Sequence, residues 1–315
     1  MIKTKIKPLI TTVLDANESI FFPRELEFIS QELFEIEYQE LKARDLIPSG
    51  AFGIPDGATT YTYYEYDKVG SAMIVANHAT DYKRVDVTGK KYTVDIQILG
   101  DAYGYNVDEI RAATMANRPL ERMRAEAAVR ALRTQEDEIA WNGNTDYNIQ
   151  GFIKGPSVPE VVIPNTGTGA STLWINKTPL QILADMNLVG NAAFVQTMGV
   201  RTSNTLLMPL EQYGFISSTP MFTAGGDTTI LEFFLKNNPF IQQVDWLNEM
   251  LGADNGDDMI MAYEKNPVCV RQVLPILFEQ FPPQQKGLDF EIICRSKTAG
   301  VVWIKPMSAA WGSGI

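Results

Sequence analysis

The sequence contains a single histidine, His78, and only two cysteines, Cys269 and Cys294. One imidazole is too few for a histidine-rich zinc site or an HExxH motif, and a Ser/His/Asp triad would depend on His78 alone. The cysteines form no CxxC motif and lie in strand-like runs, so we interpret both as small buried residues with reduced thiols. We therefore expect no metal, no cofactor, no catalytic residues and no enzyme activity.

Positive charge and long apolar runs are also scarce. Lys+Arg 27 against Asp+Glu 38 gives a net charge of -11, which is the wrong sign for gripping nucleic acid through its phosphates. No stretch approaches the roughly eighteen apolar residues of a membrane span. The apolar run after Lys3, Lys5 and Lys7 is too short for a secretory signal. We expect a cytoplasmic protein that neither spans membranes nor reads DNA sequence.

Three patterns suggest ligand or catalytic sites without meeting their requirements. The tract GTGAST near residue 167 lacks the strand and helix that would make it a phosphate loop. The tract ADNGDD at 253–258 lacks calcium-loop spacing and the required glutamate, so we interpret it as a solvated turn. Glu136 and Glu138 flank Asp137, but consecutive helical side chains point in different directions, which favours a plain charged helix end.

A long amphipathic helix is predicted from about Pro119 to Trp141. Proline suits the first helical turn, Asn117 is a suitable cap, and Gly143 stands where a helix C-cap prefers glycine. Apolar residues recur at three- or four-residue steps, so one side is expected to be buried while the charged side is exposed. The predicted apolar positions are Leu120, Met123, Ala127, Ala128, Ala131, Leu132 and Ile139.

The segment before this helix is typical of β structure. Residues 59–66 are rich in Thr and Tyr, residues 71–76 are apolar, and residues 91–99 alternate between apolar and polar side chains. This pattern predicts a long hairpin within residues 51–99. Because such a hairpin is only marginally stable alone, we expect it to lie against another element or another copy of the chain. Residues 1–50 are interpreted as an arm with a short helix from Pro23.

After the long helix, residues 178–198 predict a second helix with Thr178 as its cap. Strand and helix patterns then alternate through residues 203–275, and residues 288–296 and 301–306 are predicted to form a closing hairpin. Helices and strands are segregated and the gaps between strands have hairpin length, which favours an α+β fold over a parallel doubly wound sheet.

This order of elements resembles the major capsid proteins of tailed bacteriophages and the related encapsulin shells. The likeness is most specific at RALRTQEDEIAWNGNTDYNIQGFI (130–153), with an acidic helix end, an apolar pair, Asn-Gly-Asn and a glycine-containing strand. The preceding KKYTVDIQILGDAYGYNVDEIRAA (90–113) is similar to the strand that returns from the family's extended loop. The likeness in element order covers most of the chain.

The resemblance implies a fold with four parts. Residues 1–50 would be the N-terminal arm, residues 51–99 the extended loop, residues 100–202 with 276–315 the peripheral domain with its spine helix, and residues 203–275 the axial domain. Residues 1–50 are too few for the scaffolding extension that some members carry, so a separate scaffolding protein, or none, is expected.

The implied function is a virion protein that assembles in the host cytoplasm into hexamers and pentamers of an icosahedral head around double-stranded DNA. Scaffolding, portal and decoration proteins are the further partners that this role allows. Two alternatives stay open: an encapsulin-like compartment, and an α+β hydrolase with loop carboxylates such as Asp254 or Asp257. The residues expected to contact neighbouring subunits are Tyr61, Tyr63, Tyr66, Lys68, Lys83, Arg84, Arg130 and Arg133.

Overall fold

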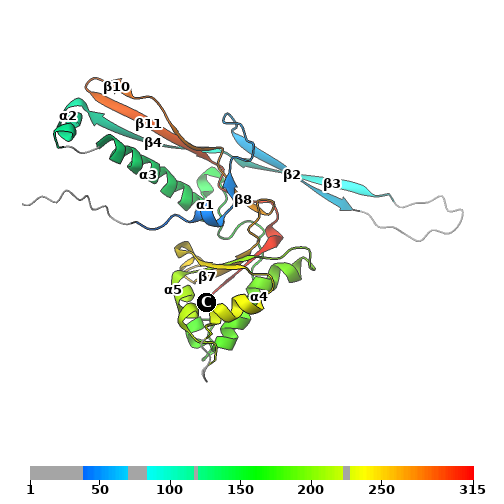
Figure 1. The fold of residues 1–315 in the computed structure, drawn as a ribbon. Coiled ribbons are helices and arrows are strands. Elements are labelled where there is room, and N and C mark those ends of the chain that lie inside the picture. The colour runs from blue at the N-terminus through cyan, green and yellow to red at the C-terminus, as the bar shows by residue number, and fades with distance from the viewer. Residues whose placement is uncertain (1–37, 70–83, 117–119, 223–227) are drawn as a thin grey trace, which may run out of the picture. The chain divides into compact units, whose positions relative to one another are not determined.

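The computed structural model describes residues 38–69, 84–116, 120–222 and 228–315. The chain divides into two compact units, Met1–Glu40 and Leu41–Ile315, and every element named below belongs to the second (Figure 1). The α-helices are α1 (Ala43–Leu46), α2 (Val107–Met115), α3 (Leu120–Asn142), α4 (Pro179–Gln196), α5 (Leu210–Ser218) and α6 (Ile230–Asn237). The strands are β1 (Ser49–Gly50), β2 (Thr60–Val69), β3 (Asp86–Asp95), β4 (Gln97–Asn106), β5 (Thr205–Met208), β6 (Gln243–Trp246), β7 (Met259–Tyr263), β8 (Val270–Val273), β9 (Ile276–Gln280), β10 (Gln284–Lys286), β11 (Asp289–Thr298), β12 (Val301–Trp303) and β13 (Ala309–Ser313). Short 3-10 helices are η2 (Thr145–Tyr147), η3 (Trp174–Asn176), η4 (Asn248–Met250) and η5 (Pro306–Ser308).

A four-stranded sheet in the order β13-β7-β5-β6 is buried on both faces. Every residue of β5 and β7 is buried, because successive side chains enter two different cores. Leu206 and Ile260 pack with apolar residues of α4, α5 and α6 on one face. Leu207 and Met261 pack on the other face with α1 and the end of α3. Strands that are buried on both faces are continuously apolar, as TLLM and MIMAY are.

The domain boundaries predicted from the sequence do not coincide with this sheet. The helix α4 and the C-terminal strand β13 both pack on it, although they lie outside the predicted range 203–275. Conversely, β8 lies inside that range but pairs with β1 and β12 in a separate three-stranded sheet. The reason is long-range pairing: β13 returns from the end of the chain to pair antiparallel with β7.

The long helix α3 is confirmed at Leu120–Asn142, with residues 117–119 outside the described ranges. It packs on β4 and β11, which pair along their full length within a sheet that also contains β9 and β10. Ala128 and Leu132 are buried, as predicted, and they pack with buried residues of β11. The other half of the predicted stripe is wrong, because Met123, Ala127 and Ala131 are exposed. The sheet therefore contacts a narrower arc of the helix than the sequence pattern suggested.

The predicted closing hairpin between residues 288–296 and 301–306 is also wrong. The strand β11 pairs with β4, β9 and β10, whereas β12 leaves it and pairs with β8. The turn between them needs Gly300, which has φ +70° and passes so close to the Gln150 carbonyl that a Cβ would lie 2.5 Å from that oxygen.

Two predictions fall on residues that the structure does not describe, and one helix that the structure shows was not predicted. The predicted helix from Pro23 lies mainly, and the apolar run 71–76 entirely, outside the described ranges. The helix α2 was not predicted, although its capping box is legible in the sequence: the Asn106 side chain accepts from the backbone of α2 and the Glu109 side chain reaches back to the Asn106 N–H. The predicted α+β class is confirmed.

Candidate intersubunit surfaces

The hairpin of β2 and β3 forms a two-stranded antiparallel sheet of ten residue pairs, from Thr60 opposite Asp95 to Val69 opposite Asp86 (Figure 1). The predicted strand at 91–99 is divided between two elements. At Ile96, which donates its N–H to the Thr59 carbonyl at 2.9 Å, the chain passes from β3 into β4 and enters a different sheet. The alternation of strand side chains then gives the hairpin two distinct faces.

One face of the hairpin packs against the rest of the chain at the base of the hairpin. Tyr61 and Tyr63 pack against a buried cluster that includes Val94 and Val273. The Tyr63 ring stacks on Tyr92 with a centroid distance of 5.1 Å, and its hydroxyl donates to the Trp303 carbonyl at 3.3 Å. Burial, followed by the nearby Tyr92 and Glu65 side chains, raises the pKa of Tyr63. Two of the predicted contact residues are therefore already engaged within their own chain.

The opposite face of the hairpin is aromatic and exposed. The Tyr64 and Tyr66 rings stack on each other at 6.4 Å and stay 60% and 68% exposed. Val85 and Val87 beside them are also exposed. The Tyr66 ring covers Gly89 on the paired strand, where a Cβ would lie 3.1 Å from the ring. We call the surface of Tyr64, Tyr66, Val85 and Val87 the hairpin face; among the described residues nothing covers it.

The remaining predicted contact residues lie in three places. Lys68 is exposed on β2 opposite Val87, and Arg84 is exposed just before β3. Arg130 and Arg133 are exposed on α3, while Lys83 lies outside the described residues. The structure brings Tyr66 and Lys68 together on one strand face but does not group the α3 arginines with them. Their role as contacts between subunits stays a prediction.

The acidic end of α3 differs most from its prediction as a plain charged helix end. Glu136 and Asp137 are buried, with exposed fractions of 1% and 8%, because α1 covers them. Arg44 Nη2 of α1 lies 2.5 Å from Glu136 Oε2, and the Ala43 N–H donates to Asp137 Oδ1 at 2.7 Å. Trp141 Nε1 donates to the other Asp137 oxygen at 2.9 Å. Burial raises the pKa of Asp137, and these two hydrogen bonds oppose the shift.

Two further contacts hold α1 in place. The buried Tyr263 hydroxyl donates to the Leu46 carbonyl at 2.6 Å. Lys42 Nζ lies 3.0 Å from Asp245 Oδ1, donates to the Trp246 carbonyl at 3.1 Å and sits over the Trp246 ring. We call residues 42–47 with these partners the α1 anchor. The only signal for it in the sequence is the apolar run Ile139–Trp141 beside the acids, which reveals burial but not the partner.

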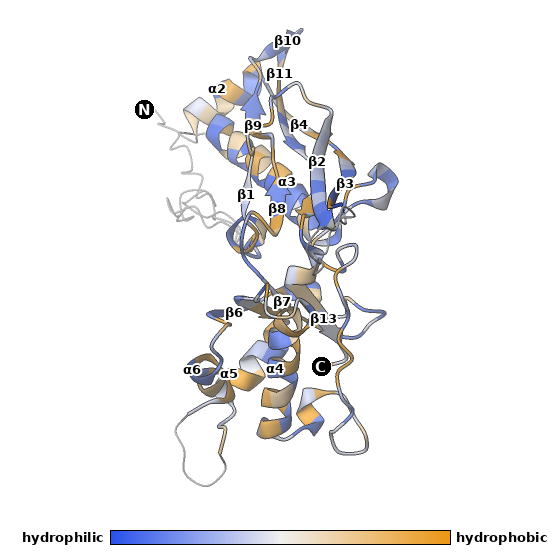
Figure 2. Cartoon of the chain, turned by 90° about the vertical axis from the view of Figure 1, so that its right-hand side faces the viewer, coloured by the Kyte–Doolittle hydropathy of each residue, from blue (hydrophilic) through white to orange (hydrophobic). Residues whose placement is uncertain are grey.

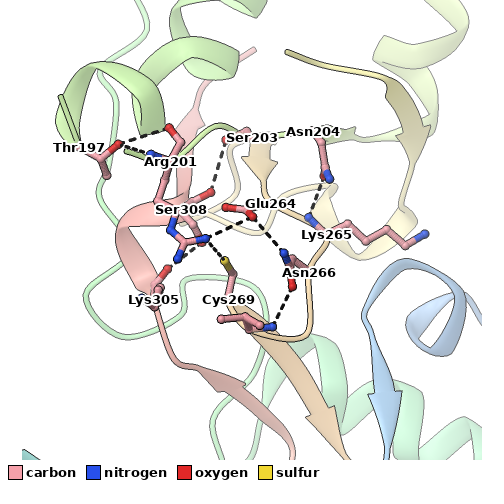
Figure 3. A network of polar contacts seen from close by, with 11 residues as sticks. Thr197, Arg201, Ser203, Asn204, Glu264, Lys265, Asn266, Cys269, Lys305 and Ser308 are labelled. Atoms are coloured by element: carbon pink, nitrogen blue, oxygen red, sulfur yellow. Dashed lines mark hydrogen bonds and ion pairs between the residues drawn. The ribbon is translucent and has the colours of Figure 1, made fainter. Parts of the chain in front are cut away.

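A polar network joins three loops where the chain passes between its sheets (Figure 3). Arg201 Nη1 lies 3.5 Å from Glu264 Oε1 and 3.6 Å from Cys269 Sγ. The Lys265 N–H donates to Asn204 Oδ1 at 2.7 Å. Burial and the adjacent Glu264 raise the pKa of the Cys269 thiol to about 11. A nucleophilic cysteine needs the opposite shift, so the Cys269 thiol is not activated by this network.

Two of the three carboxylates of the 253–258 turn, those of Asp254 and Asp258, are engaged with their own chain. Asp254 Oδ1 lies 2.5 Å from Lys154 Nζ, and this contact lowers the pKa of Asp254. Asp258 accepts from the Gly252 N–H at 2.8 Å and from Gln212 at 2.5 Å. Across the described ranges no group of three or more His, Cys, Asp or Glu side chains is placed to hold a metal ion, and no described helix is long and apolar enough to cross a membrane. His78 lies outside those ranges.

Comparisons with known proteins give consistent results. A family model described as major capsid protein matches residues 70–315. The capsid of Myoviridae phage XM1 has a similar structure, with a TM-score of 0.80 and 16% identity over 94% of this chain and 99% of that chain. The capsid of an empty GTA particle matches with a TM-score of 0.62 and 10% identity over 91% and 94%. A virus-like particle from Pyrococcus furiosus matches with a TM-score of 0.54 and 11% identity over 85% and 90%. No functionally curated protein gives a significant sequence match.

Proposed function

This chain belongs to the major capsid protein family, and from that premise we propose that its copies form the hexamers and pentamers of an icosahedral phage head enclosing double-stranded DNA. The β2–β3 hairpin is the extended loop that lies on a neighbouring copy, and α3 is the spine helix of the peripheral domain. The sheet of β13, β7, β5 and β6 with α4, α5 and α6 belongs to the axial domain. Assembly takes place in the host cytoplasm, and scaffolding, portal and decoration proteins complete the particle.

The observation that carries this proposal is the uncovered hairpin face. Two-stranded sheets are marginal in water unless a third element covers their apolar side. Here Tyr64 and Tyr66 stack on each other without cover from any described residue of their own chain. Tyrosine suits such a surface because its ring buries a large area and its hydroxyl tolerates water before the partner arrives. A neighbouring copy supplies the cover.

The charge of the chain supports enclosing DNA rather than gripping it. Lys+Arg 27 against Asp+Glu 38 leaves a net charge of -11. A shell with many fixed cations would bind the phosphates of its genome tightly, because each neutralised phosphate releases counterions. An acidic shell repels the duplex and leaves it free to move.

The similarities favour a phage head over the two alternative functions. The likeness to the phage XM1 capsid, at a TM-score of 0.80, exceeds that to the Pyrococcus furiosus virus-like particle, at 0.54. The hydrolase alternative depends on available loop carboxylates such as Asp254 or Asp257, and the structure engages the first of these. Asp254 is paired with Lys154, and the backbones of Asp254 and Asp257 bond to each other in a closed turn.

The test is to express the chain, collect particles by sedimentation and image them by electron microscopy. We expect closed shells from the unmodified chain. The double variant Tyr64→Ser/Tyr66→Ser is expected to stay as monomers or small oligomers, because the hairpin face loses its aromatic area. Tyr147→Ser is the matched control, since Tyr147 is 57% exposed but lies in η2, away from the hairpin.

Two results would contradict the proposal. A soluble monomer under all assembly conditions, including co-expression with the phage's scaffolding protein, would refute self-assembly. Shells from the hairpin variant at unmodified yield would refute the role of the hairpin face. Nuclease-protected nucleic acid in particles isolated from infected cells then separates a phage head from a compartment that packages protein.

A further inference from the structure

The helix α4 is unusual for a surface helix because it presents no charge to solvent. Its eighteen residues, PLQILADMNLVGNAAFVQ, contain one ionisable side chain, Asp185. That carboxylate is buried, and its Oδ2 atom lies 2.6 Å from Nζ of the equally buried Lys177. Every other side chain is apolar, small or an uncharged amide. Figure 2 shows the apolar stretches of α4 and α5 in orange near β7 and β13.

Both sides of α4 carry apolar side chains, but the described residues cover only one of them. Ile182, Met186 and Val189 enter the core beneath the β13-β7-β5-β6 sheet. At 100° per residue, an opposite arc of about 80° holds four exposed apolar positions together with the half-buried Asn191, and the exposed Phe194 lies just outside it. We call this surface the α4 face; its members are Leu180, Ala184, Leu188 and Val195.

Exposure on the α4 face is extensive. Leu180 is 63% exposed and Val195 is 71% exposed. The apolar surface continues past the end of the helix through Met198, Val200 and Met307, all exposed, and η5, which holds Met307, packs against α4. A helix that is apolar on all sides is normally buried. From Leu180 to Val195 the strip is about 22 Å long at 1.5 Å per residue, and extended exposed apolar surface of this kind is where interaction sites are found.

We propose that the α4 face is a contact surface for a second copy of this chain, separate from the hairpin face. The inference rests on the proposed assembly into rings. Copies that each carry a net charge of -11 repel one another, so close approach is favoured where no carboxylate faces the partner. The α4 face meets that condition along its whole length. A ring of five or six copies joins unlike faces, so the α4 face docks on a different surface of its neighbour.

The first test compares three single variants. Leu188→Glu and Val195→Glu each place a carboxylate on the α4 face, at side chains that make no core contact, so circular dichroism should show an unchanged melting profile. We expect particle yield to fall at least tenfold. Val195→Ile keeps the apolar surface and should assemble like the unmodified chain. Normal yield from both glutamate variants would overturn the inference.

The second test identifies what touches the face. Particles are assembled from this chain alone, with a photo-cross-linking residue at position 188 and a mixture of ¹⁴N- and ¹⁵N-labelled copies. Cross-linked peptides that carry both labels would place a second copy on the α4 face. Cross-links confined to single copies, in particles of normal yield, would overturn the inference and leave the proposed function intact. If the unmodified chain forms no particles even when it is co-expressed with the phage's scaffolding protein, the proposed function itself fails, and this inference fails with it.

Discussion

Removing Arg44 is expected to weaken the fold through the carboxylate it leaves behind. Arg44 Nη2 lies 2.5 Å from Glu136 Oε2, and the Glu136 residue is only 1% exposed. The other oxygen, Oε1, has no hydrogen-bond partner among the described residues. In the variant Arg44→Met, the Glu136 carboxylate therefore loses its ion-pair partner while it stays buried.

The expected loss in free energy of unfolding follows from how exposed Glu136 and Arg44 are. Breaking a fully buried ion pair costs about 3–5 kcal/mol, because an uncompensated charge remains in the interior. The Arg44 side chain is 31% exposed, so water reaches the vacated position and reduces the cost. We expect Arg44→Met to lower the free energy of unfolding by about 2–3 kcal/mol. The double variant Arg44→Met/Glu136→Leu removes both charges and should lie within about 1 kcal/mol of the unmodified chain.

The assay is urea denaturation of the unassembled chain, with unfolding monitored by tryptophan fluorescence. Arg122→Met is the matched control, since Arg122 pairs with Glu126 at 3.5 Å on the exposed side of the same helix α3. Exposed pairs contribute little, so its effect should be below about 0.5 kcal/mol. If Arg44→Met were as mild as the control, or if the double variant equalled the sum of its single variants, the ion pair would not hold the α1 anchor.

Three further predictions follow. Tyr263→Phe removes the hydroxyl that donates to α1 at 2.6 Å and should cost about 1–3 kcal/mol in urea denaturation, whereas Tyr66→Phe on the exposed hairpin face should be nearly neutral. Cys269, whose pKa burial raises to about 11, and the buried Cys294 should resist thiol reagents at pH 8 until the chain unfolds; rapid labelling of native protein would contradict this. Burial raises the folded pKa of Asp137 above its unfolded value of about 3.9, so its contribution to stability is present below that pH and is lost as pH rises through the folded pKa. Urea midpoints between about pH 3.5 and pH 6 should therefore fall less steeply in Asp137→Asn, and an identical slope in both proteins would count against the burial argument.

The long helix shows how far a sequence pattern determines structure. Its extent was predicted nearly to the residue, because proline before it and Gly143 after it mark its two ends. The environment of the helix was not predicted, because periodicity shows which side chains are apolar but not how wide the covering surface is. Met123 stays exposed beside a narrow sheet, while Glu136 is buried under an element that lies 92 residues earlier in the sequence.

The strand pairings that cross the predicted domain boundaries were not foreseen, for a related reason. The segment AAWGS carries no local sign that β13 pairs with β7, and VRQV carries none that β8 belongs with β1 and β12. Pairings between distant strands depend on the packing of whole faces and not on neighbouring residues. In the hairpin, by contrast, both strands are close in sequence. The Thr- and Tyr-rich run 59–66 and the alternating run 91–99 predicted a hairpin before its register was known.

The two proposed contact faces differ in chemistry, and this difference bears on how an acidic chain assembles. The hairpin face is built of tyrosines, whose hydroxyls stay hydrated before and after contact, so it tolerates sliding and partial exposure. The α4 face is aliphatic, and its contribution comes from removing apolar area from water, at about 25 cal/mol per Å². A contact of that kind is favourable only when it closes fully, whereas the hairpin contact can form in stages. We therefore expect the α4 face to hold a ring together, while the hairpin face adjusts between copies as the shell takes its final form.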